Sequence, residues 1–433
     1  MSRLRVGFAT GRMDSRQHAT CHAEPQPHRP HSLMTSGFRE FSRGAVPIVV
    51  TLLFSGCAAI HRPPTTVPDL LKDAEVARAS ERALRDTVVA RLARRAIAKP
   101  DHSLDILLLS GGGQNGSYGV GFMRGWRERT DSPMPQFDLI TAISTGALQS
   151  PFVLLGTKAS IDTLTDLYRN AADRIAPSLD WWFWLRKTGG LVNSKRLEDN
   201  IAHIVDAPFR DSLNKAFAQD RQVVFGTTDM DLAIGRAWDL KTALDTGEAG
   251  LIRTRRLFRT AGAIPGIFSP VIIDGHVHSD GGVVSNILTL LTIDDYRAMA
   301  KRVRDAGVRA PIAVRLFVIV NGWTYAAPTV IDPASRKQIS GRWGNVMFYL
   351  NQVQVIEGLD NLATAATGSI PGLTMQMQWT GVPAEAALDP AANTLFNKQW
   401  MQTLEDLGSK RARSTKPWDA IESPYARPAN LTP

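Results

Sequence analysis

Two short glycine-rich segments carry the residue types that acyl-transfer chemistry needs. They are residues 109–116, Leu-Ser-Gly-Gly-Gly-Gln-Asn-Gly, and residues 142–146, Ala-Ile-Ser-Thr-Gly. Each follows an apolar run and leads into a helical pattern, which predicts a strand, a tight turn and a helix start. Successive glycines can turn backbone N–H groups toward a developing negative charge. Ser144 lies at the second bend, where small neighbours leave a nucleophile exposed. The pair predicts an oxyanion loop followed by a serine nucleophile.

The glycine loop also permits a second interpretation. Gly111, Gly113 and Gly116 satisfy the G-x-G-x-x-G pattern of dinucleotide-binding turns. Dinucleotide-binding domains with this pattern carry an acidic residue at the end of the next strand, about 20 residues further along the chain. Asp138 stands at about that distance, but it begins its predicted strand instead of ending it. A serine in a small-residue turn can likewise be only a turn. Two such motifs at two strand-to-helix junctions favour catalysis over nucleotide binding.

A serine nucleophile needs a base, and the order of residues restricts the choice. The histidines downstream of Ser144 are His203, His276 and His278. None follows Asp280, so a triad built on Asp280 cannot have the Ser, acid, His order of α/β-hydrolases. A triad that pairs His276 or His278 with an earlier acid remains open. Asp280, next to two glycines on a predicted loop, could instead take the serine proton directly as a dyad; the alternative is an ordinary turn aspartate.

The motifs and their order resemble those of patatin-like phospholipases. That family carries a glycine-rich oxyanion loop, a Gly-x-Ser-x-Gly elbow and an Asp-Gly-Gly or Asp-Gly-Ala motif. The matching segments here are residues 111–116, 142–146 and 280–282. Residues 261–270 are similar to the family's segment before the aspartate. The resemblance covers about residues 104–286.

This resemblance implies an α/β fold, a patatin-like three-layer sandwich with a largely parallel central sheet and helices on both faces. It implies that Ser144 is the nucleophile and Asp280 its base, without a catalytic histidine, metal or cofactor. The N–H groups of the oxyanion hole would belong to Gly111, Gly112 and Gly113. The implied activity is lipid acyl hydrolysis of the phospholipase A or lysophospholipase type, through an acyl-enzyme, on membrane lipids or other acyl esters. The alternative is a non-catalytic lipoprotein that binds lipid or a partner protein.

Two residues depart from the family pattern. Ala142 stands where the elbow usually has its first glycine, and its single methyl group is expected to fit. Asn115 stands where the glycine loop usually has a basic residue. Without that positive charge, the sequence supports acyl hydrolysis more strongly than it supports a preference for anionic phospholipids.

The N-terminal region resembles a bacterial lipoprotein signal. Residues 45–55 are uncharged and mostly apolar, follow Arg39 and Arg43, and lead to Phe-Ser-Gly-Cys ending at Cys57. About 11 apolar residues are too few to cross a bilayer but suit a signal-peptide core. Cys57 is therefore the expected lipidation site, which anchors the chain in the bacterial cell envelope. Ala58 after the cysteine favours the outer membrane over the inner. A buried helix with an incidental cysteine is the alternative.

The translation start is open between Met1 and Met34, because the first 33 residues have no apolar periodicity. The two resemblances, together with the composition, imply five regions. They are a leader with signal peptide (1–56), a lipid-anchored helical spacer (57–100), the catalytic domain (101–330), its C-terminal α/β extension (331–408) and a disordered tail (409–433). Residues 1–56 hold seven arginines and three acidic residues, so the formal charge of +9 falls to +5 when they are removed. This mild positive excess is compatible with an anionic membrane surface, and solubility alone would also explain it. No basic stripe or binding motif points to nucleic acid, and protein partners are unknown.

Apolar runs and turn residues predict the elements that position the motifs. Strands are expected at residues 106–109, 139–143, 223–227, 271–273, 276–278, 312–320 and 373–379, and helices at 346–362 and 395–407. Asp229 and Asp231 are expected to cap or turn, without a catalytic role. The aromatic cluster from Trp181 to Trp184 could form a lid hinged at the following glycines, or could be packed core.

Overall fold

The computed structural model describes residues 62–421 except 175–177, 180–188, 325–327, 384–385, 387–388 and 395. Cys57, the leader and the cluster from Trp181 to Trp184 lie outside the described residues. Within that part of the chain, no helix combines the length and the apolar character that a bilayer crossing requires.

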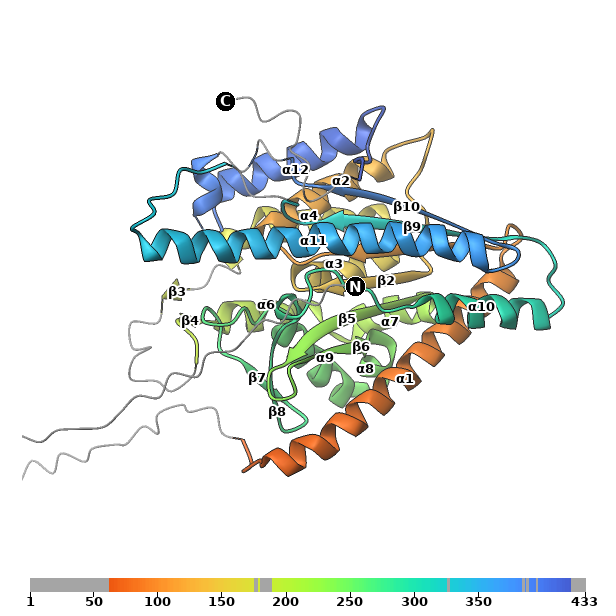
Figure 1. Ribbon diagram of the computed structural model, residues 1–433, viewed down its shortest axis with the longest axis horizontal. Coiled ribbons are helices and arrows are strands. Elements are labelled where there is room, and N and C mark those ends of the chain that lie inside the picture. The colour runs from red at the N-terminus through yellow and green to blue at the C-terminus, as the bar shows by residue number, and fades with distance from the viewer. Residues whose placement is uncertain are drawn as a thin grey trace, which may run out of the picture. The chain divides into compact units, whose positions relative to one another are not determined.

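A mostly parallel sheet lies at the centre (Figure 1). Its path runs β10-β9-β1-β2-β5-β8-β7, and β6 also pairs with β5. The pairings among β10, β9, β1, β2 and β5 are parallel, whereas β6 and β8 pair antiparallel with β5, and β7 pairs antiparallel with β8. Their bounds are β1 (Ser103–Leu109), β2 (Leu139–Ile143), β5 (Gln222–Asp229), β6 (Ile234–Asp239), β7 (Val271–Ile273), β8 (His276–Asp280), β9 (Ile312–Val320) and β10 (Leu373–Gly381). A separate antiparallel pair joins β3 (Ser178–Leu179) to β4 (Val192–Asn193).

Helices cover both faces of the sheet. The helices are α1 (Val67–Ala98), α2 (Gly116–Arg127), α3 (Thr145–Leu155), α4 (Lys158–Arg169), α5 (Ala171–Arg174), α6 (Lys195–Ile204), α7 (Ala207–Phe217), α8 (Leu240–Leu244), α9 (Gly247–Ala261), α10 (Ile293–Asp305), α11 (Arg336–Ser369) and α12 (Lys398–Arg413). Within the described residues, short 3-10 turns accompany them: η1 (Gly113–Asn115), η2 (Gly281–Val283) and η4 (Pro390–Asn393).

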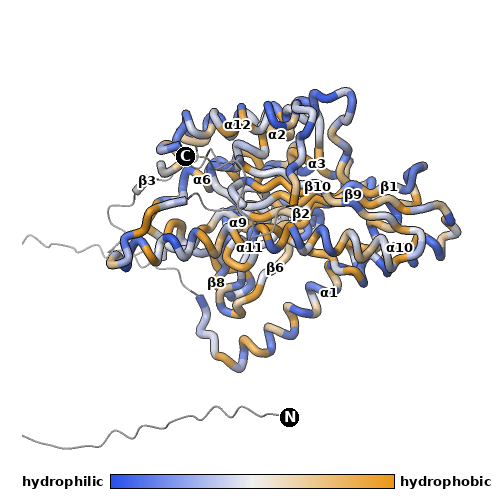
Figure 2. The backbone as a smooth tube through the Cα atoms, turned by 45° about the horizontal axis from the view of Figure 1, so that its top comes forward, coloured by the Kyte–Doolittle hydropathy of each residue, from blue (hydrophilic) through white to orange (hydrophobic). Residues whose placement is uncertain are grey.

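Strand β1 shows how two cores arise. Leu107 and Leu109 point to one face and pack with residues from α2, α3, α4, α6, α7, α8 and α9. Ile106 and Leu108 point to the other face and pack with α1, α10 and α11. All seven residues of β1 are buried, as expected for a parallel strand covered on both sides. Figure 2, in which the chain is coloured by residue hydropathy, shows that hydrophobic residues concentrate in the central strands. The expected three-layer α/β fold is confirmed.

Helix α1 is helical as predicted, but it is not only a spacer. Its N-terminal half is largely exposed, whereas Val88 and Leu92 in its second half are completely buried in the core beside β1. Arg95 also donates to Asp138 at 2.8 Å. The boundary expected at residue 100 is therefore wrong, because the second half of α1 covers a face of the sheet.

The C-terminal part of the chain completes the sheet and one helical layer. Strand β10 pairs in parallel with β9, so the expected extension belongs to the same sheet. The tail expected from residue 409 is wrong over its first part, because α12 continues to Arg413 with Ser409 and Ala412 buried. The Trp418 ring then packs against Phe122 in a tilted arrangement and against Trp126 edge to face, with ring centroids 5.1 and 5.0 Å apart. Residues 422–433 lie outside the described part of the chain.

Candidate active site

Ser144 occupies a sharp turn between β2 and α3. Its backbone has φ 52° and ψ −123°, a sparsely populated conformation for a non-glycine residue. A Cβ on Gly146 would lie 2.6 Å from the Leu109 carbonyl oxygen, so only glycine fits two residues after the serine. Ala142 is fully buried in β2 and its methyl group packs in the core, which accommodates this departure from the family pattern. The geometry is that of a nucleophile elbow.

Asp280 lies beside Ser144 at the end of β8. Ser144 Oγ donates a hydrogen bond to Asp280 Oδ2 at 2.6 Å, and the two residues are only 6% and 4% exposed. Antiparallel pairing of β8 with β5 sets Asp280 opposite Thr227. The Gly282 N–H donates to Asp280 Oδ1 at 2.8 Å and fixes the second carboxylate oxygen. The structure thus brings the predicted serine and aspartate into direct contact.

Asp280 is suited to accept a proton near neutral pH. Burial raises the pKa of its carboxyl group to about 6, and the hydrogen bonds from Ser144 and Gly282 oppose that shift only in part. The ionised form is the one that can take the serine proton. A base with a pKa close to the working pH combines that ionised form with useful basicity.

Hydrolysis of a short soluble ester is expected to follow the ionisation of Asp280. The raised pKa keeps the carboxyl group protonated up to about pH 6. We therefore expect kcat/KM to be flat above about pH 7 and to fall about tenfold per pH unit well below pH 6. A pH–rate profile from pH 4.5 to 8.5 measures this. A profile that stays flat down to pH 4.5 would contradict a buried aspartate as the base.

Of the three glycine N–H groups expected to form the oxyanion hole, one already has a partner. The Gly111 N–H donates to the Asn286 carbonyl oxygen at 3.0 Å, so it is not free to bind an oxyanion. In the part of the chain that the structure describes, no hydrogen bond is found for the N–H groups of Gly112 and Gly113. Gly113 lines the same pocket as Ser144. The expectation for Gly111 is corrected: it holds the loop in place.

Close backbone approaches explain why this loop needs glycine. A Cβ on Gly111 would lie 2.9 Å from Ser144 Cβ, and one on Gly112 would lie 1.7 Å from the Asn321 carbonyl oxygen. Asn321, just after β9, donates from its backbone N–H to Ser110 Oγ at 2.8 Å and from Nδ2 to the Ser110 carbonyl at 2.9 Å. Asn321 therefore positions the loop.

Two asparagines at this site were missed by reasoning from sequence. Asn286 Nδ2 donates to the Gly111 carbonyl oxygen at 3.2 Å and to Gln352 Oε1 at 2.8 Å. Asn321 follows the apolar run of β9 directly, a position at which a polar residue often enters a site in parallel sheets. That placement was the only signal in the sequence. Asn115 accepts a hydrogen bond from Trp400 Nε1 at 3.0 Å, so it is tied to α12.

The histidines lie in other surroundings. His203 is exposed on α6, whereas His276 and His278 are buried on β8. His276 Nδ1 lies 2.7 Å from Asp229 Oδ2, and His278 Nδ1 lies 3.2 Å from an oxygen of Thr227. Among the described residues, no histidine hydrogen-bonds to the serine or aspartate of the site. The geometry favours the dyad over the triad.

Asp229 and Asp231 belong to a partly buried ionic cluster that includes His276. Asp229 Oδ1 accepts the N–H groups of residues 231 and 232, which confirms the predicted turn. Asp229, Asp231 and His276 lie close enough to share a metal ion. However, Arg62 pairs with Asp231 at 2.6 Å, and His276 bridges Asp229 and Asp73. These internal pairs give the cluster a structural role.

Asp138, the acidic residue that a dinucleotide-binding site would need, is not placed for that role. Asp138 is completely buried at the start of β2, whereas the glycine loop follows the end of the neighbouring strand β1. Its carboxylate accepts from Arg95 at 2.8 Å, from Lys99 at 3.1 Å and from the Asp105 N–H at 2.8 Å. With its hydrogen-bonding capacity used in this way, Asp138 is not placed to bind a ribose.

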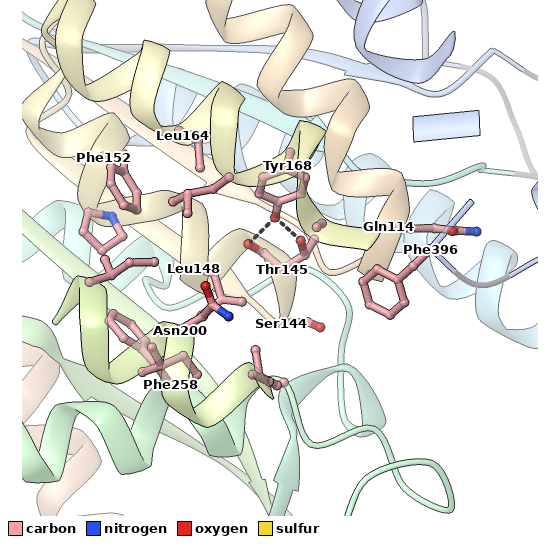
Figure 3. A pocket seen from close by; sticks show the side chains of 18 of the residues that line it. Gln114, Ser144, Thr145, Leu148, Phe152, Leu164, Tyr168, Asn200, Phe258 and Phe396 are labelled. Carbon is pink, nitrogen blue, oxygen red and sulfur yellow. Dashed lines mark hydrogen bonds between the residues drawn. The ribbon is translucent and has the colours of Figure 1, made fainter. Parts of the chain in front are cut away.

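An apolar pocket leads away from Ser144. It encloses a cavity of about 110 Å³, and Figure 3 shows Ser144 near Leu148, with Phe152 farther along. Leu148 and Phe152 are four residues apart, so they share one face of α3, the helix that begins directly after Ser144. The Phe152 and Phe209 rings pack with centroids 5.5 Å apart. Tyr168 closes another side, where its hydroxyl group contacts Thr145 and Gln149.

One comparison with known proteins assigns a family to part of the chain. Residues 107–293 match the family model described as Patatin-like phospholipase. These residues form a patatin-like phospholipase domain. A solved structure, VipD from Legionella pneumophila, is similar with 11% sequence identity and a TM-score of 0.30. That similarity covers 70% of this chain and 66% of VipD, so the chain spans slightly under two thirds of the VipD length. A comparison with curated proteins gave no match.

The patatin-like domain contains both Ser144 and Asp280, and its matched range lies close to the expected residues 104–286. The recognition made from sequence motifs is confirmed. The family description names phospholipases, which are hydrolases of lipid acyl esters.

Proposed function

We propose that this chain hydrolyses acyl esters of membrane lipids with a Ser144–Asp280 dyad. The observation that carries the proposal is the 2.6 Å hydrogen bond from Ser144 Oγ to the buried Asp280 carboxylate, at the edge of an apolar pocket. The raised pKa of Asp280, the strained serine turn and the two free loop N–H groups support the same chemistry.

The proposed reaction has two halves. Asp280 Oδ2 takes the Ser144 proton while Ser144 Oγ attacks the ester carbonyl carbon, and the N–H groups of Gly112 and Gly113 bind the resulting oxyanion. Collapse of this intermediate expels the alcohol, which receives the proton from Asp280, and leaves an acyl-enzyme. Water then gives a proton to Asp280 and attacks the acyl carbonyl. The second collapse releases the fatty acid and returns the proton to Ser144.

The pocket suits a fatty acyl chain better than a polar group. From Ser144 to Phe152 the helix rises about 12 Å at 1.5 Å per residue. Along that distance the wall includes Leu148, Phe152, Leu164 and Phe258. Burying methylene groups there is favourable by roughly 0.8 kcal/mol each. The pocket therefore favours long-chain esters over short ones.

Leu148→Trp is expected to separate long from short acyl chains. The larger ring would fill the pocket one turn after Ser144, so hydrolysis of a long-chain ester should fall at least about tenfold, while a short acetyl ester should react nearly as before. The ratio of kcat/KM values for the two esters measures this. Ile252→Trp, at an exposed position on α9, is the matched control and should leave the ratio unchanged. An unchanged ratio in Leu148→Trp would place the acyl chain elsewhere.

A non-catalytic lipid-binding protein is the alternative function. Incubation of bacterial phospholipids with wild-type and Ser144→Ala protein distinguishes the two, with fatty acid and lysophospholipid measured by mass spectrometry. We expect both products with wild-type protein only. Equal, background amounts from both proteins would support the binding function. The products would also define the headgroup and the position that is cleaved.

A lipid anchor at Cys57 remains a proposal, because that residue lies outside the described part of the chain. The described chain begins at residue 62 and enters α1 at Val67, so any anchor is close in sequence to the domain. We propose a bacterial cell-envelope location, with the outer membrane favoured. Mass spectrometry of protein from its native host should find a lipidated Cys57 as the first residue, and Cys57→Ser should release the protein from membranes. An unmodified Cys57 in membrane-free protein would contradict the anchor.

A further inference from the structure

The N-terminal half of α11 exposes an apolar stripe. We call residues 336–350 the α11 arm. Ile339, Trp343 and Met347 are 47%, 67% and 54% exposed, and their spacing of four places them on one face of the helix. Figure 1 shows the arm reaching beyond the central strands. Its large hydrophobic side chains therefore face solvent within the described structure.

This stripe does not continue the face that packs on the domain. In the second half of α11, Ile356, Leu359 and Ala363 are buried against the sheet. At 3.6 residues per turn, the exposed stripe of the arm lies roughly opposite that buried face. The domain to which α11 belongs cannot cover it.

The charges of the α11 arm all have one sign. Arg336, Lys337 and Arg342 are basic, and the sequence has no acidic residue from position 336 to 356. Lys337 and Arg342 flank the apolar stripe on opposite sides when the sequence is plotted at 3.6 residues per turn. Apolar and aromatic side chains bordered by cations are typical of helices that lie in the interface of an anionic bilayer.

The C-terminal end of the arm lies next to residues that contact the active-site loop. Tyr349 packs edge to face on Trp323, with ring centroids 6.2 Å apart. Three residues on, Gln352 accepts a hydrogen bond from Asn286, whose carbonyl oxygen binds the Gly111 N–H. Trp343 precedes Gln352 by nine residues, or about 13 Å of helix. A surface that binds the arm would therefore lie near the oxyanion loop.

We infer that the α11 arm is a docking surface for an anionic phospholipid bilayer. The arm lies in the headgroup plane, inserts Ile339, Trp343 and Met347, and pairs its basic residues with lipid phosphates. The inference rests on the proposed lipid hydrolysis and adds how the enzyme meets its substrate. Charge complementarity favours a bilayer over a second copy, because pairing two arms would bring their like charges together.

Vesicle binding tests the inference in full-length protein. The protein carries Cys57→Ser, so that no lipid anchor contributes, and Ser144→Ala, so that no lipid is consumed. We expect binding to vesicles of phosphatidylcholine with phosphatidylglycerol at least tenfold tighter than to phosphatidylcholine alone. The further substitutions Ile339→Ser, Trp343→Ser and Met347→Ser together should weaken binding at least tenfold. Ile252→Ser, at an exposed position on α9, is the matched control and should bind normally.

A second set of variants tests the contribution of the basic residues separately from that of the apolar stripe. Arg336→Gln, Lys337→Gln and Arg342→Gln together should remove most of the preference for anionic vesicles. Equal vesicle binding by the apolar triple variant and its parent would overturn the inference. A dimer in solution that the apolar triple variant dissociates, with vesicle binding unchanged, would also overturn it and assign the arm to contacts between copies.

Activity measurements keep this inference distinct from the proposed function. With Ser144 restored, the apolar triple variant should keep kcat/KM on a short soluble ester and lose at least tenfold on vesicle lipids. Equal loss on both substrates would contradict a docking role. If neither substrate is hydrolysed by any form, the proposed function fails, while the vesicle binding of the Ser144→Ala protein still decides the role of the arm.

Discussion

Ser144→Ala and Asp280→Asn should each reduce ester hydrolysis by a factor on the order of 10⁴ or more, with the fold intact. The first removes the nucleophile, and the second removes the base that accepts its proton at 2.6 Å. Losses of this size are typical when one member of a nucleophile–base unit is removed. Initial rates on a short soluble ester measure the loss, and thermal unfolding followed by circular dichroism confirms the fold.

Replacement of His203, His276 and His278 by glutamine provides the contrast. The first is exposed, and the other two bond to Asp229 and Thr227 instead of the dyad. We expect a folded triple variant to keep substantial activity, although loss of the contact between His276 and Asp73 could lower its unfolding temperature. Complete inactivity in a folded triple variant would favour a triad.

Gly112→Ala should lower kcat on the order of 100-fold or more. A Cβ at this position would lie 1.7 Å from the Asn321 carbonyl oxygen, so the loop must shift. The shifted N–H groups would no longer meet the developing oxyanion, and loss of one such donor typically costs 10²- to 10³-fold. Steady-state kinetics on a soluble ester measure the effect.

Gly358→Ala is the matched control for this substitution. It lies on α11 with no atom within 4 Å of an added Cβ, and alanine favours the helix. We expect its kcat to equal that of the wild type. Unchanged kcat in a folded Gly112→Ala protein would move the oxyanion hole elsewhere.

Local patterns in the sequence predicted the elements that hold the dyad. The turns at Ser144 and the glycine loop each combine an apolar strand, small residues and a helix start within about a dozen residues. Such local signals predict β1, β2, α2 and α3 without knowledge of distant contacts. The order of the three motifs then supported the resemblance to the patatin-like family, which the match over residues 107–293 confirms.

Contacts between segments far apart in the chain determine features of the site that local sequence patterns could not predict. Asp280 was expected on a loop, but it ends β8, where pairing with β5 sets it opposite Thr227. Gly111 was expected to donate to an oxyanion, but Asn286, 175 residues away, takes its N–H. Periodicity within one segment carries no information about such partners.

The same limit applies to the ends of the domain. The helical pattern of α1 predicted a helix, but only its packing beside β1 shows that its second half belongs to the domain. Polar residues after position 408 predicted a tail, yet Ser409 and Ala412 are buried because α12 packs on α2. Small side chains at such a contact permit close helix packing, and their small size leaves little hydrophobic signal in the sequence.

Labelling with a fluorophosphonate tests the central claim most directly. This reagent forms a covalent adduct with an activated serine. Peptide mapping by mass spectrometry should find one adduct at Ser144 in wild-type protein, with its rate of formation greatly reduced in Asp280→Asn. No adduct at Ser144 in folded wild-type protein, or equally fast labelling in Asp280→Asn, would contradict a dyad in which Asp280 activates Ser144.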